Sequence, residues 1–490
     1  LLGGHHVDLP VAADEEAPVA LPETASGAGP IRDLESRLKE ILMTSPRPRL
    51  SRPIRLALGA LAFGALAFFP TVAPPAQPTD ISLVLSQEGG RRVALAIPSP
   101  KAPASEVVER DLVDPFRSAL TGDLGSSPWF VLADSALHPK GFRPPATREE
   151  GDAWIASGAQ FLLDTQIQAE GTNVVVTAQL IDLRTLRSIL GKRYSAAGVS
   201  IRRVAHTIAN DVVRQFTGRP GPFLTRIAFV SDRDGGRGKE IYVMDWDGEN
   251  ERRLTFHRSL SIAPDWSYDG SKIIYQSFVS TPPGLYWFSL SGGTRNKIPV
   301  PTELNSAPSF SPDGKMVAYA GSVRGNPEIF VVNLDGSGHR RLTNSSAIDS
   351  SPRFSPNGRE IAFTSNRQGT PQIYLMDLEG ANVRKLTLTG NWSDEPAFSP
   401  DGGRLAYACR NEGDFQICVL DLTSGRTFQI SSGPGTNENP TWSPDGSRIA
   451  WELQRGRSTQ IVSAGVDGSG FKVLTEAGNN GYPVWERTMD

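Results

Sequence analysis

From Arg226 onward, short runs of alternating apolar and polar residues recur along the chain. Two examples are Glu-Ile-Ala-Phe-Thr-Ser at 360–365 and Ile-Tyr-Leu-Met-Asp at 373–377. Alternation with a period of two predicts half-buried β-strands, and the Asp-Gly and Asn-Gly pairs between the runs predict tight hairpin turns. We therefore expect an all-β region of short antiparallel strands.

This strand pattern belongs to an internal repeat. A motif of proline, any residue, an aromatic residue and Ser-Pro-Asp-Gly recurs every 44 residues with small departures. It begins at Pro264, Pro308, Pro352, Pro396 and Pro440, and a shortened sixth copy follows at Pro483. Each repeat contains four short strands, counting the motif itself, and four antiparallel strands every 40 to 50 residues are typical of a β-propeller blade.

The two ends of the repeat region complete one blade between them. The first outer strands, at 226–230, 241–245 and 252–255, have no proline motif before them, and the last motif, at 482–485, has no outer strands after it. Joining these two parts closes the ring and leaves no open sheet edge. The sequence therefore predicts a six-bladed β-propeller over residues 226–490.

Residues 80–218 show a different pattern, in which strands and helices alternate. We expect strands at 92–97, 129–133, 160–168, 173–183 and 188–194, and helices at 105–120, 147–157 and 201–216. The last helix carries apolar residues at helical spacing, which predicts that it packs on a sheet. The expected fold class is mainly β, with a small α/β domain followed by a linker at 218–222 and the propeller.

The N-terminal region resembles an export signal. The apolar run 56–69 is about 14 residues long, short of the roughly 20 that a membrane-spanning helix needs. Arginines precede it and a Pro/Ala-rich stretch follows, which is typical of a secretory signal. We expect residues 43–79 to be a signal peptide and linker that starts at Met43, with residues 1–42 an over-extended start or disordered. The alternative is a cytoplasmic extension ahead of an uncleaved anchor.

Charge narrows the range of partners. The chain has 50 basic and 53 acidic residues and a formal net charge of -3. This near balance argues against a nucleic-acid binder or a membrane-surface patch, so proteins and small solutes are the expected partners.

The only two cysteines are Cys409 and Cys418. If Gly413 and Asp414 form a two-residue hairpin turn, the cysteines lie directly opposite each other, and a disulfide is possible in an oxidising compartment. The alternative is two small buried apolar side chains in a shifted register.

Candidate chemistry is sparse. The sequence has no Gly-x-Ser-x-Gly nucleophile motif and no glycine-rich loop that opens a helix, and the propeller has only two histidines, His257 and His339, nearly two blades apart. We expect no enzyme activity, no cofactor and no metal. The Asp-Gly of each motif is read as a turn rather than a calcium loop, and the motif aromatics as inter-blade core rather than a stacking platform.

Several segments together resemble the TolB family of the Tol-Pal cell-envelope system. They are the helix 202–209 (Arg-Arg-Val-Ala-His-Thr-Ile-Ala), the junction Phe-Thr-Gly at 216–218 leading to 225–231 (Thr-Arg-Ile-Ala-Phe-Val-Ser), and the Ser-Pro-Asp-Gly repeats. The resemblance covers about residues 80–485. It implies a non-enzymatic, monomeric periplasmic protein that supports outer-membrane integrity and constriction during cell division.

The resemblance also implies two partners, the peptidoglycan-associated lipoprotein Pal at the propeller and the inner-membrane protein TolA at the N-terminal segment, 77–88. An extended strand there could add to the edge of a partner's sheet. Its candidate contacts are Asp80, Ile81, Leu83 and Leu85. The alternative is that this segment is a plain first strand of the α/β domain.

For Pal, we expect the loops that join the last strand of one blade to the first strand of the next, because they surround one mouth of the channel. The candidate residues are Leu304, Asn305, Ser306, Ala307, Asp349, Ser350, Asp394, Glu395, Asn437 and Glu438. Their four carboxylates favour a basic or amide-rich partner. Side chains that only cap their own turns are one alternative. A second is an exported propeller enzyme or solute-binding protein that uses the acidic mouth.

Overall fold

The computed structural model describes residues 92–141, 144–170, 173–195, 200–235, 238–323, 325–388, 390–410 and 412–488. The expected signal peptide, the start at Met43 and the N-terminal segment with Asp80, Ile81, Leu83 and Leu85 lie outside these residues. Among the helices of the described residues, none is both long and apolar enough to cross a membrane.

The α/β domain is built on one five-stranded sheet in the order β2-β1-β3-β4-β5. Its strands are β1 (Val93–Ala96), β2 (Phe130–Leu132), β3 (Phe161–Glu170), β4 (Asn173–Asp182) and β5 (Arg187–Ser195). β1 pairs in parallel with β2 and β3, while β3, β4 and β5 form an antiparallel meander. All five strands lie where the sequence pattern predicts them.

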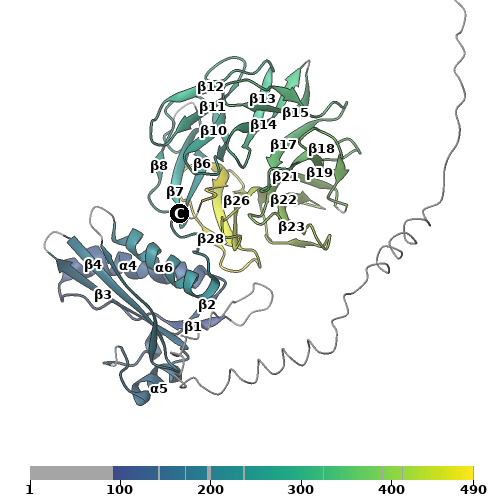
Figure 1. Ribbon diagram of the computed structural model, residues 1–490. Coiled ribbons are helices and arrows are strands. Elements are labelled where there is room, and N and C mark those ends of the chain that lie inside the picture. The colour runs from purple at the N-terminus through teal and green to yellow at the C-terminus, as the bar shows by residue number, and fades with distance from the viewer. Residues whose placement is uncertain are drawn as a thin grey trace, which may run out of the picture. The chain divides into compact units, whose positions relative to one another are not determined.

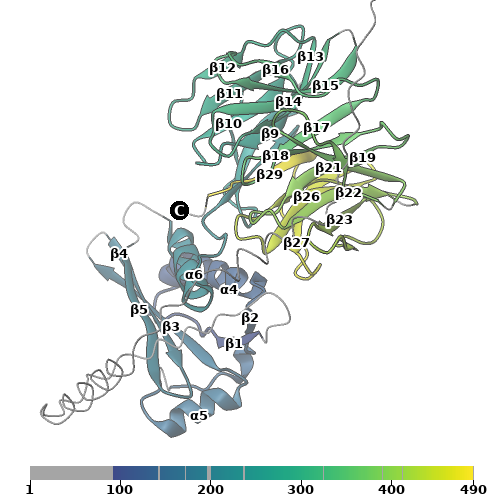
Figure 2. The same ribbon diagram turned by 45° about the vertical axis from the view of Figure 1, so that its right-hand side comes forward.

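Helices cover both faces of this sheet. The helices α4 (Asp114–Ser126) and α6 (Ile201–Thr217) lie side by side on one face (Figures 1 and 2) and pack with the face that bears Leu163. The helix α5 (Arg148–Ala156) packs through Trp154 with the face that bears Leu162. Neighbouring residues of a strand point to opposite faces, so the two helical layers sandwich the sheet.

Local signals explain where the helices begin and end. Thr147 and Glu150 form a reciprocal capping box at the start of α5. The Ser200 hydroxyl accepts a hydrogen bond from the Arg203 amide at 3.2 Å and caps α6, which ends at Gly218 in the left-handed conformation (φ 75°). The predicted helix 201–216 is therefore confirmed to within one residue.

The helix predicted at 105–120 differs from the structure. It consists of α3 (Glu106–Val108), a π-helical turn (Glu109–Val113) and α4, which continues to Ser126. Pro115 lies at the start of α4. It has no amide hydrogen to donate to the preceding turn, and its ring crowds the carbonyl four residues earlier, so the chain widens before the α-helix resumes. A short 3-10 helix, Ser135–Leu137, follows β2.

The C-terminal part is a β-propeller of six four-stranded sheets (Figure 1). The three blades that follow the first blade are β9–β12 (Ser261–Trp266, Lys272–Ser277, Gly284–Ser289, Arg295–Ile298), β13–β16 (Leu304–Phe310, Met316–Val323, Asn326–Asn333, Arg340–Arg341) and β17–β20 (Asp349–Phe354, Glu360–Ser365, Gln372–Asp377, Arg384–Lys385). The next two are β21–β24 (Trp392–Phe398, Arg404–Arg410, Gln416–Asp421, Thr427–Gln429) and β25–β28 (Thr436–Trp442, Arg448–Arg455, Ser458–Gly465, Lys472–Val473).

The remaining blade confirms the predicted closure of the ring. C-terminal β29 (Asn480–Trp485) pairs with β6 (Arg226–Ser231), which is followed by β7 (Glu240–Asp245) and β8 (Arg252–Arg253). The Glu486 carboxylate adds an ion pair to Arg226, with 2.5 Å between Oε1 and Nη2. The first and last strands of the propeller are therefore held in one sheet.

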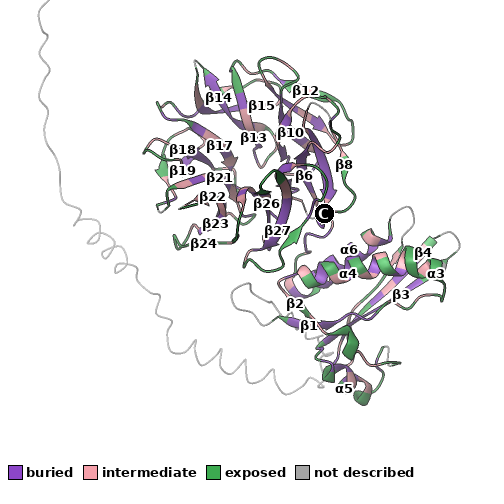
Figure 3. Cartoon of the chain, turned by 180° about the vertical axis from the view of Figure 1, so that it is seen from behind, coloured by how far each residue is buried: buried purple, intermediate pink, exposed green. Residues whose placement is uncertain are grey.

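The aromatic residue of each repeat motif fills the space between neighbouring blades, as predicted. Trp266 and Phe310 are fully buried, in apolar clusters that combine strands of two blades. Trp485 is 1% exposed, and its indole N–H donates to the Thr225 hydroxyl at 2.8 Å. Figure 3 shows the propeller strands mostly in the colour of buried residues and their loops largely exposed.

In five of the six blades, a hydroxyl side chain just after the fourth strand makes two hydrogen bonds to the start of the third strand. Thr255 Oγ1 accepts a hydrogen bond from the Ile241 amide at 2.8 Å and donates to Glu240 Oε2 at 2.6 Å. The same pair of bonds is made by Thr343, Thr387, Ser431 and Thr475 in other blades. This hydroxyl side chain, a threonine in four blades and Ser431 in the fifth, therefore holds the end of the outermost strand to its neighbour.

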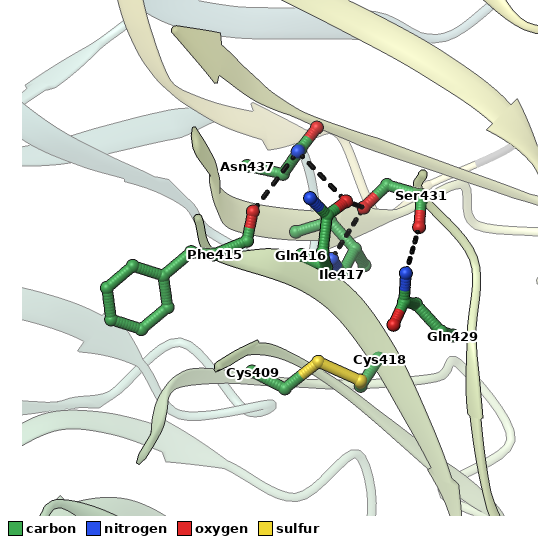
Figure 4. The surroundings of a disulfide bond; sticks show 8 residues. All are labelled: Cys409, Phe415, Gln416, Ile417, Cys418, Gln429, Ser431 and Asn437. Atoms are coloured by element: carbon green, nitrogen blue, oxygen red, sulfur yellow. Dashed lines mark hydrogen bonds between the residues drawn. A yellow bond between two sulfur atoms is a disulfide. The ribbon is translucent and has the colours of Figure 1, made fainter. Parts of the chain in front are cut away.

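Cys409 and Cys418 form a disulfide between β22 and β23 (Figure 4), with 5.8 Å between their Cα atoms. The predicted register is wrong, because Cys409 lies opposite Gln416 and Cys418 lies opposite Tyr407. β22 ends at Arg410 and β23 begins at Gln416, so the connection is longer than the expected two-residue turn. The cysteines are diagonal neighbours on one face, still close enough for the bond.

The α/β domain contacts the propeller through α4 and α6, which meet strand β26 and the turn after β7. Arg202 of α6 forms an ion pair with Asp247, and Arg448 of β26 donates to the Ser126 carbonyl at 3.2 Å. Residues of both domains, including Phe216 and Trp246, contribute to one buried apolar cluster. This contact therefore combines apolar burial with paired charges.

Candidate functional site

The central channel of the propeller contains two cavities, one above the other. The mouth cavity, about 240 Å³, opens between the loops that enter the inner strands. The second cavity, about 260 Å³, lies toward the turns that leave these strands. Arg353, Pro440 and Pro483 line both cavities, so these residues form the boundary between them.

One backbone feature recurs around the mouth cavity. The residue before the motif proline has a positive φ, between 48° and 56°, in all six blades. These residues are Ala263, Ala307, Ser351, Glu395, Asn439 and Tyr482, and each lines the mouth cavity. The proline has no N–H to pair with the second strand, and the register shifts there in every blade.

This repeated bulge costs energy. A left-handed backbone at a residue other than glycine costs roughly 1–2 kcal/mol. Six such residues in one ring present their side chains to a single cavity. Backbone strain of this kind concentrates at binding sites, which makes the mouth cavity the candidate site.

Carboxylates gather on one side of the mouth. Glu395 lines the cavity, and its Oε2 accepts a hydrogen bond from the Asn439 amide at 2.6 Å. Burial, and then the charge of Asp394, raises the pKa of Glu395 well above its ordinary value. Burial, and then the charge of Glu452, raises the pKa of Glu438. The mouth therefore holds several like charges that a cation could neutralise.

The Pal-binding residues expected from the sequence fall into two groups. Ser306, Ala307 and Glu395 line the mouth cavity, and Leu304 lies at its rim with 39% of its surface exposed. Ser350, Asp394 and Glu438 are partly buried near the starts of the innermost strands β17, β21 and β25, where the sequence predicted loops. Asp394 accepts hydrogen bonds from the Thr364 hydroxyl at 2.7 Å and from the Glu395 amide at 2.7 Å.

The other three predicted residues are buried, and their side chains already bond to other groups of the protein. Asp349 is fully buried and forms an ion pair with Arg367 at 3.0 Å. Asn305 and Asn437 bond to carbonyl groups of neighbouring loops, and the Trp451 indole N–H donates to Asn437 at 2.7 Å (Figure 4 shows part of this network). These three side chains therefore bond within the protein, mainly to neighbouring hairpins, instead of facing the mouth cavity.

Three further cavity residues, Ser351, Asn439 and Tyr482, end segments that the sequence places around the mouth, although they were not among the candidate contacts. They share the repeat position before the motif proline. Glu452 does not line the cavity but contacts Asn439 and Tyr482, which do, and no sequence signal pointed to it. It lies on a second strand, β26, and accepts a hydrogen bond from the Tyr482 amide at 3.0 Å. Burial raises the pKa of Glu452.

The Asp-Gly turns of the repeat motifs lie at the other end of the inner strands and satisfy their own carboxylates. The hydroxyls of Ser311 and Ser443 donate to Asp313 and Asp445, each at 2.6 Å. These hydrogen bonds within the turns agree with the prediction that the Asp-Gly pairs are turns rather than calcium loops. Among the described residues, no group of three or more His, Cys, Asp and Glu side chains is arranged to hold a metal ion.

Six blades closed by an N-terminal and a C-terminal strand, after a small α/β domain, define a class of closed β-propeller proteins with a central channel. A family model described as "TolB beta propeller domain" matches residues 213–396 and 392–488, more than half of the chain. The chain therefore belongs to the TolB β-propeller family.

Relatives agree with this family. The Tol-Pal system protein TolB of Geobacter sulfurreducens is 34% identical over 198 residues, 40% of this chain and 44% of the relative. That of Syntrophotalea carbinolica is 36% identical over 162 residues, 32% of this chain and 37% of the relative. The matches thus span less than half the length of these relatives. The crystal structure of TolB from Acinetobacter baumannii has a TM-score of 0.71 and 27% identity, and covers 81% of this chain and 97% of that one.

Proposed function

We propose that this protein is a non-enzymatic periplasmic component of a Tol-Pal system. In this proposal the mouth of the propeller binds a Pal-like peptidoglycan-associated lipoprotein, and the N-terminal segment binds a TolA-like inner-membrane protein. The protein then supports outer-membrane integrity and constriction during cell division. The family membership and the names of the relatives support this assignment.

One observation carries the assignment of the mouth. A strained ring of six residues surrounds an open cavity, and partly buried carboxylates lie beside it. A partner that inserts a basic or amide side chain there would relieve the repulsion among the carboxylates and satisfy their free oxygen atoms. The exposed Leu304 and the small side chains of Ser306 and Ala307 leave room for a packed contact around it.

Two observations support the periplasmic location. The apolar run 56–69 resembles a secretory signal, and a disulfide persists in oxidising compartments. The N-terminal segment is assigned to TolA on its alternating residues Ile81, Leu83 and Leu85, which could extend a partner's sheet.

A pull-down from envelope extract with mass spectrometry tests the function. The wild-type protein is expected to retain a Pal-like lipoprotein, and Ala307→Arg combined with Ser350→Arg is expected to lose it. The two arginines add positive charge and bulk at the mouth.

The matched control is Ala381→Arg combined with Thr423→Arg, which adds the same charge in exposed turns at the opposite ends of the blades. Retention of the lipoprotein by this control and its loss from the mouth variant support the proposal. If both variants retain the lipoprotein equally, the interface lies elsewhere on the protein. Turnover of an oligosaccharide or peptide by the pure protein would contradict a non-enzymatic function.

A further inference from the structure

The residue after the motif proline forms a second ring in the channel, below the strained ring. Its six members are Asp265, Ser309, Arg353, Ala397, Thr441 and Val484. Four of them are small and uncharged, which keeps the channel open at this level. The two charged members, Asp265 and Arg353, come from blades that are not neighbours.

Five of these six residues line the second cavity of the channel. Phe354, Trp442 and Trp485 contribute apolar surface to the same cavity, together with several prolines. The cavity of about 260 Å³ is slightly below the usual range for drug-sized ligands, roughly 300–1,000 Å³. It therefore suits a small ligand with an apolar body.

The negative charge in this cavity is already neutralised. Asp265 is fully buried and forms an ion pair with Arg487 at 2.8 Å. Its other oxygen accepts a hydrogen bond from the Phe310 amide at 2.8 Å. The Arg487 guanidinium also stacks 4.4 Å from the centre of the Tyr268 ring and donates to the Trp266 carbonyl at 2.9 Å.

Arg353, in contrast, keeps most of its hydrogen-bonding capacity. A guanidinium has five N–H donors, and among the described residues Arg353 uses one, from Nη1 to the Pro308 carbonyl at 3.2 Å. None of the ion pairs between described residues includes Arg353. Burial lowers the pKa of Arg353, while the charges of Asp265 and Glu395 raise it, so two carboxylates lie near this guanidinium. Asp265 is already bonded to Arg487, and the remaining N–H donors of Arg353 are open to an anion in the cavity.

We infer that the second cavity binds a small molecule or peptide end that carries a carboxylate on an apolar body, with the carboxylate on Arg353. The planar guanidinium matches a carboxylate in a two-point contact. The aromatic and proline walls favour a singly charged ligand with apolar carbon over a free inorganic anion. This ligand is separate from the partner proposed at the mouth.

Binding of N-acetyl-leucine and of its carboxamide to the full chain, followed by ligand-observed NMR, tests this inference. The two probes have the same shape and differ in charge. The acid is expected to bind with a dissociation constant on the order of 1 mM, the size expected for so small a ligand, and about ten-fold more tightly than the amide. Equal binding of the two probes, or no binding of the acid at about 20 mM, would overturn the inference.

Variants locate the site. Arg353→Gln is expected to reduce acid binding about ten-fold, while Arg359→Gln, an exposed arginine in the same blade, leaves it unchanged. Ala397→Phe fills the cavity without a change of charge and is expected to abolish binding. If both Arg353→Gln and Ala397→Phe still bind the acid, the ligand lies elsewhere and the inference is contradicted. Two independent variants are used so that poor folding of one does not decide the test.

Discussion

The imidazole of His206 and the carboxylate of Asp123 lie 2.7 Å apart, Nδ1 to Oδ2, and both side chains are almost completely buried. His206 is on α6 and Asp123 on α4, so the pair ties together the two helices that cover one face of the sheet. On its other side His206 faces Asp247 of the propeller at 3.9 Å, and Arg202 pairs with the same Asp247. One charged group thus connects the sheet-covering helices with the propeller.

This pair predicts a pH dependence of stability. Burial lowers the pKa of His206, but the hydrogen bond and charge of Asp123 outweigh it and raise the pKa above the ordinary value. A raised histidine pKa stabilises the folded state fully below the unfolded pKa of about 6.5, and this stabilisation is lost as the pH rises through the folded pKa. We expect urea denaturation to show a smaller contribution from His206 at pH 9 than at pH 6.

Two substitutions check the origin of this effect. His206→Gln is expected to remove this pH-dependent component. Burial raises the pKa of Asp123 to about 6, so Asp123→Asn is expected to destabilise the protein by about 3 kcal/mol at pH 7, where this carboxyl is ionised, because it breaks a buried pair. His339→Gln is the control, since burial lowers the pKa of His339 and its contribution has the opposite sign. An unchanged pH profile for His206→Gln would show that the pair does not titrate in this range.

The buried carboxylate of Glu395 at the mouth cavity lowers the stability of the folded propeller. Its raised pKa means that the folded state takes up a proton more readily than the unfolded chain, so this carboxylate destabilises the fold at high pH and less as the pH falls. We expect Glu395→Gln to stabilise the propeller at pH 8 by about 1 kcal/mol, with a smaller gain at pH 5, and to weaken partner binding. Thermal unfolding at the two pH values measures this. A loss of stability at pH 8 would contradict it.

The disulfide between Cys409 and Cys418 closes a short loop within one blade. The chain-entropy argument gives about 2–3 kcal/mol for a loop of this length. We expect Cys409→Ser combined with Cys418→Ser to lower the free energy of unfolding by about this amount and to make it insensitive to dithiothreitol. A wild-type protein that dithiothreitol leaves unchanged would contradict this prediction.

Closure of the ring through β29 predicts a large effect at its last residue. Trp485 is buried and packs in the cluster that joins β29 to the neighbouring strands. Trp485→Ala is expected to cost about 3–5 kcal/mol in denaturation experiments. Phe428→Ala, on an outermost strand with 40% of the side chain exposed, is expected to cost less than about 1.5 kcal/mol. Similar costs at the two positions would argue against a ring held by its last strand.

The sequence predicted the blades and the closure of the ring because both follow from local patterns. Strand alternation, the Asp-Gly turns and the 44-residue spacing of Pro264 to Pro440 all depend on neighbours along the chain. The predicted two-residue turn at Gly413 and Asp414 gave the cysteine hairpin the wrong register, because the connection between Arg410 and Gln416 is longer than two residues.

The site was predicted only in part. The candidate residues lie at the mouth end of the innermost strands and not in the expected loops. The side chains of Asn305 and Asp349 are buried in the protein, and alternation along a strand does not resolve this at a bulge. Arg353 lines the channel, and Glu452 contacts Tyr482 of the cavity lining, because six blades converge on one axis. Such contacts join residues far apart in sequence, which no local pattern reveals.

The central claim is that the mouth of the propeller docks a protein partner. Photo-crosslinking from position 304 tests it most directly, with a benzoylphenylalanine in place of Leu304 at the rim and in place of Thr423 at the opposite ends of the blades. We expect an adduct with a Pal-like lipoprotein from position 304 and none from position 423. An adduct with that lipoprotein from position 423, and none from position 304, would contradict the claim.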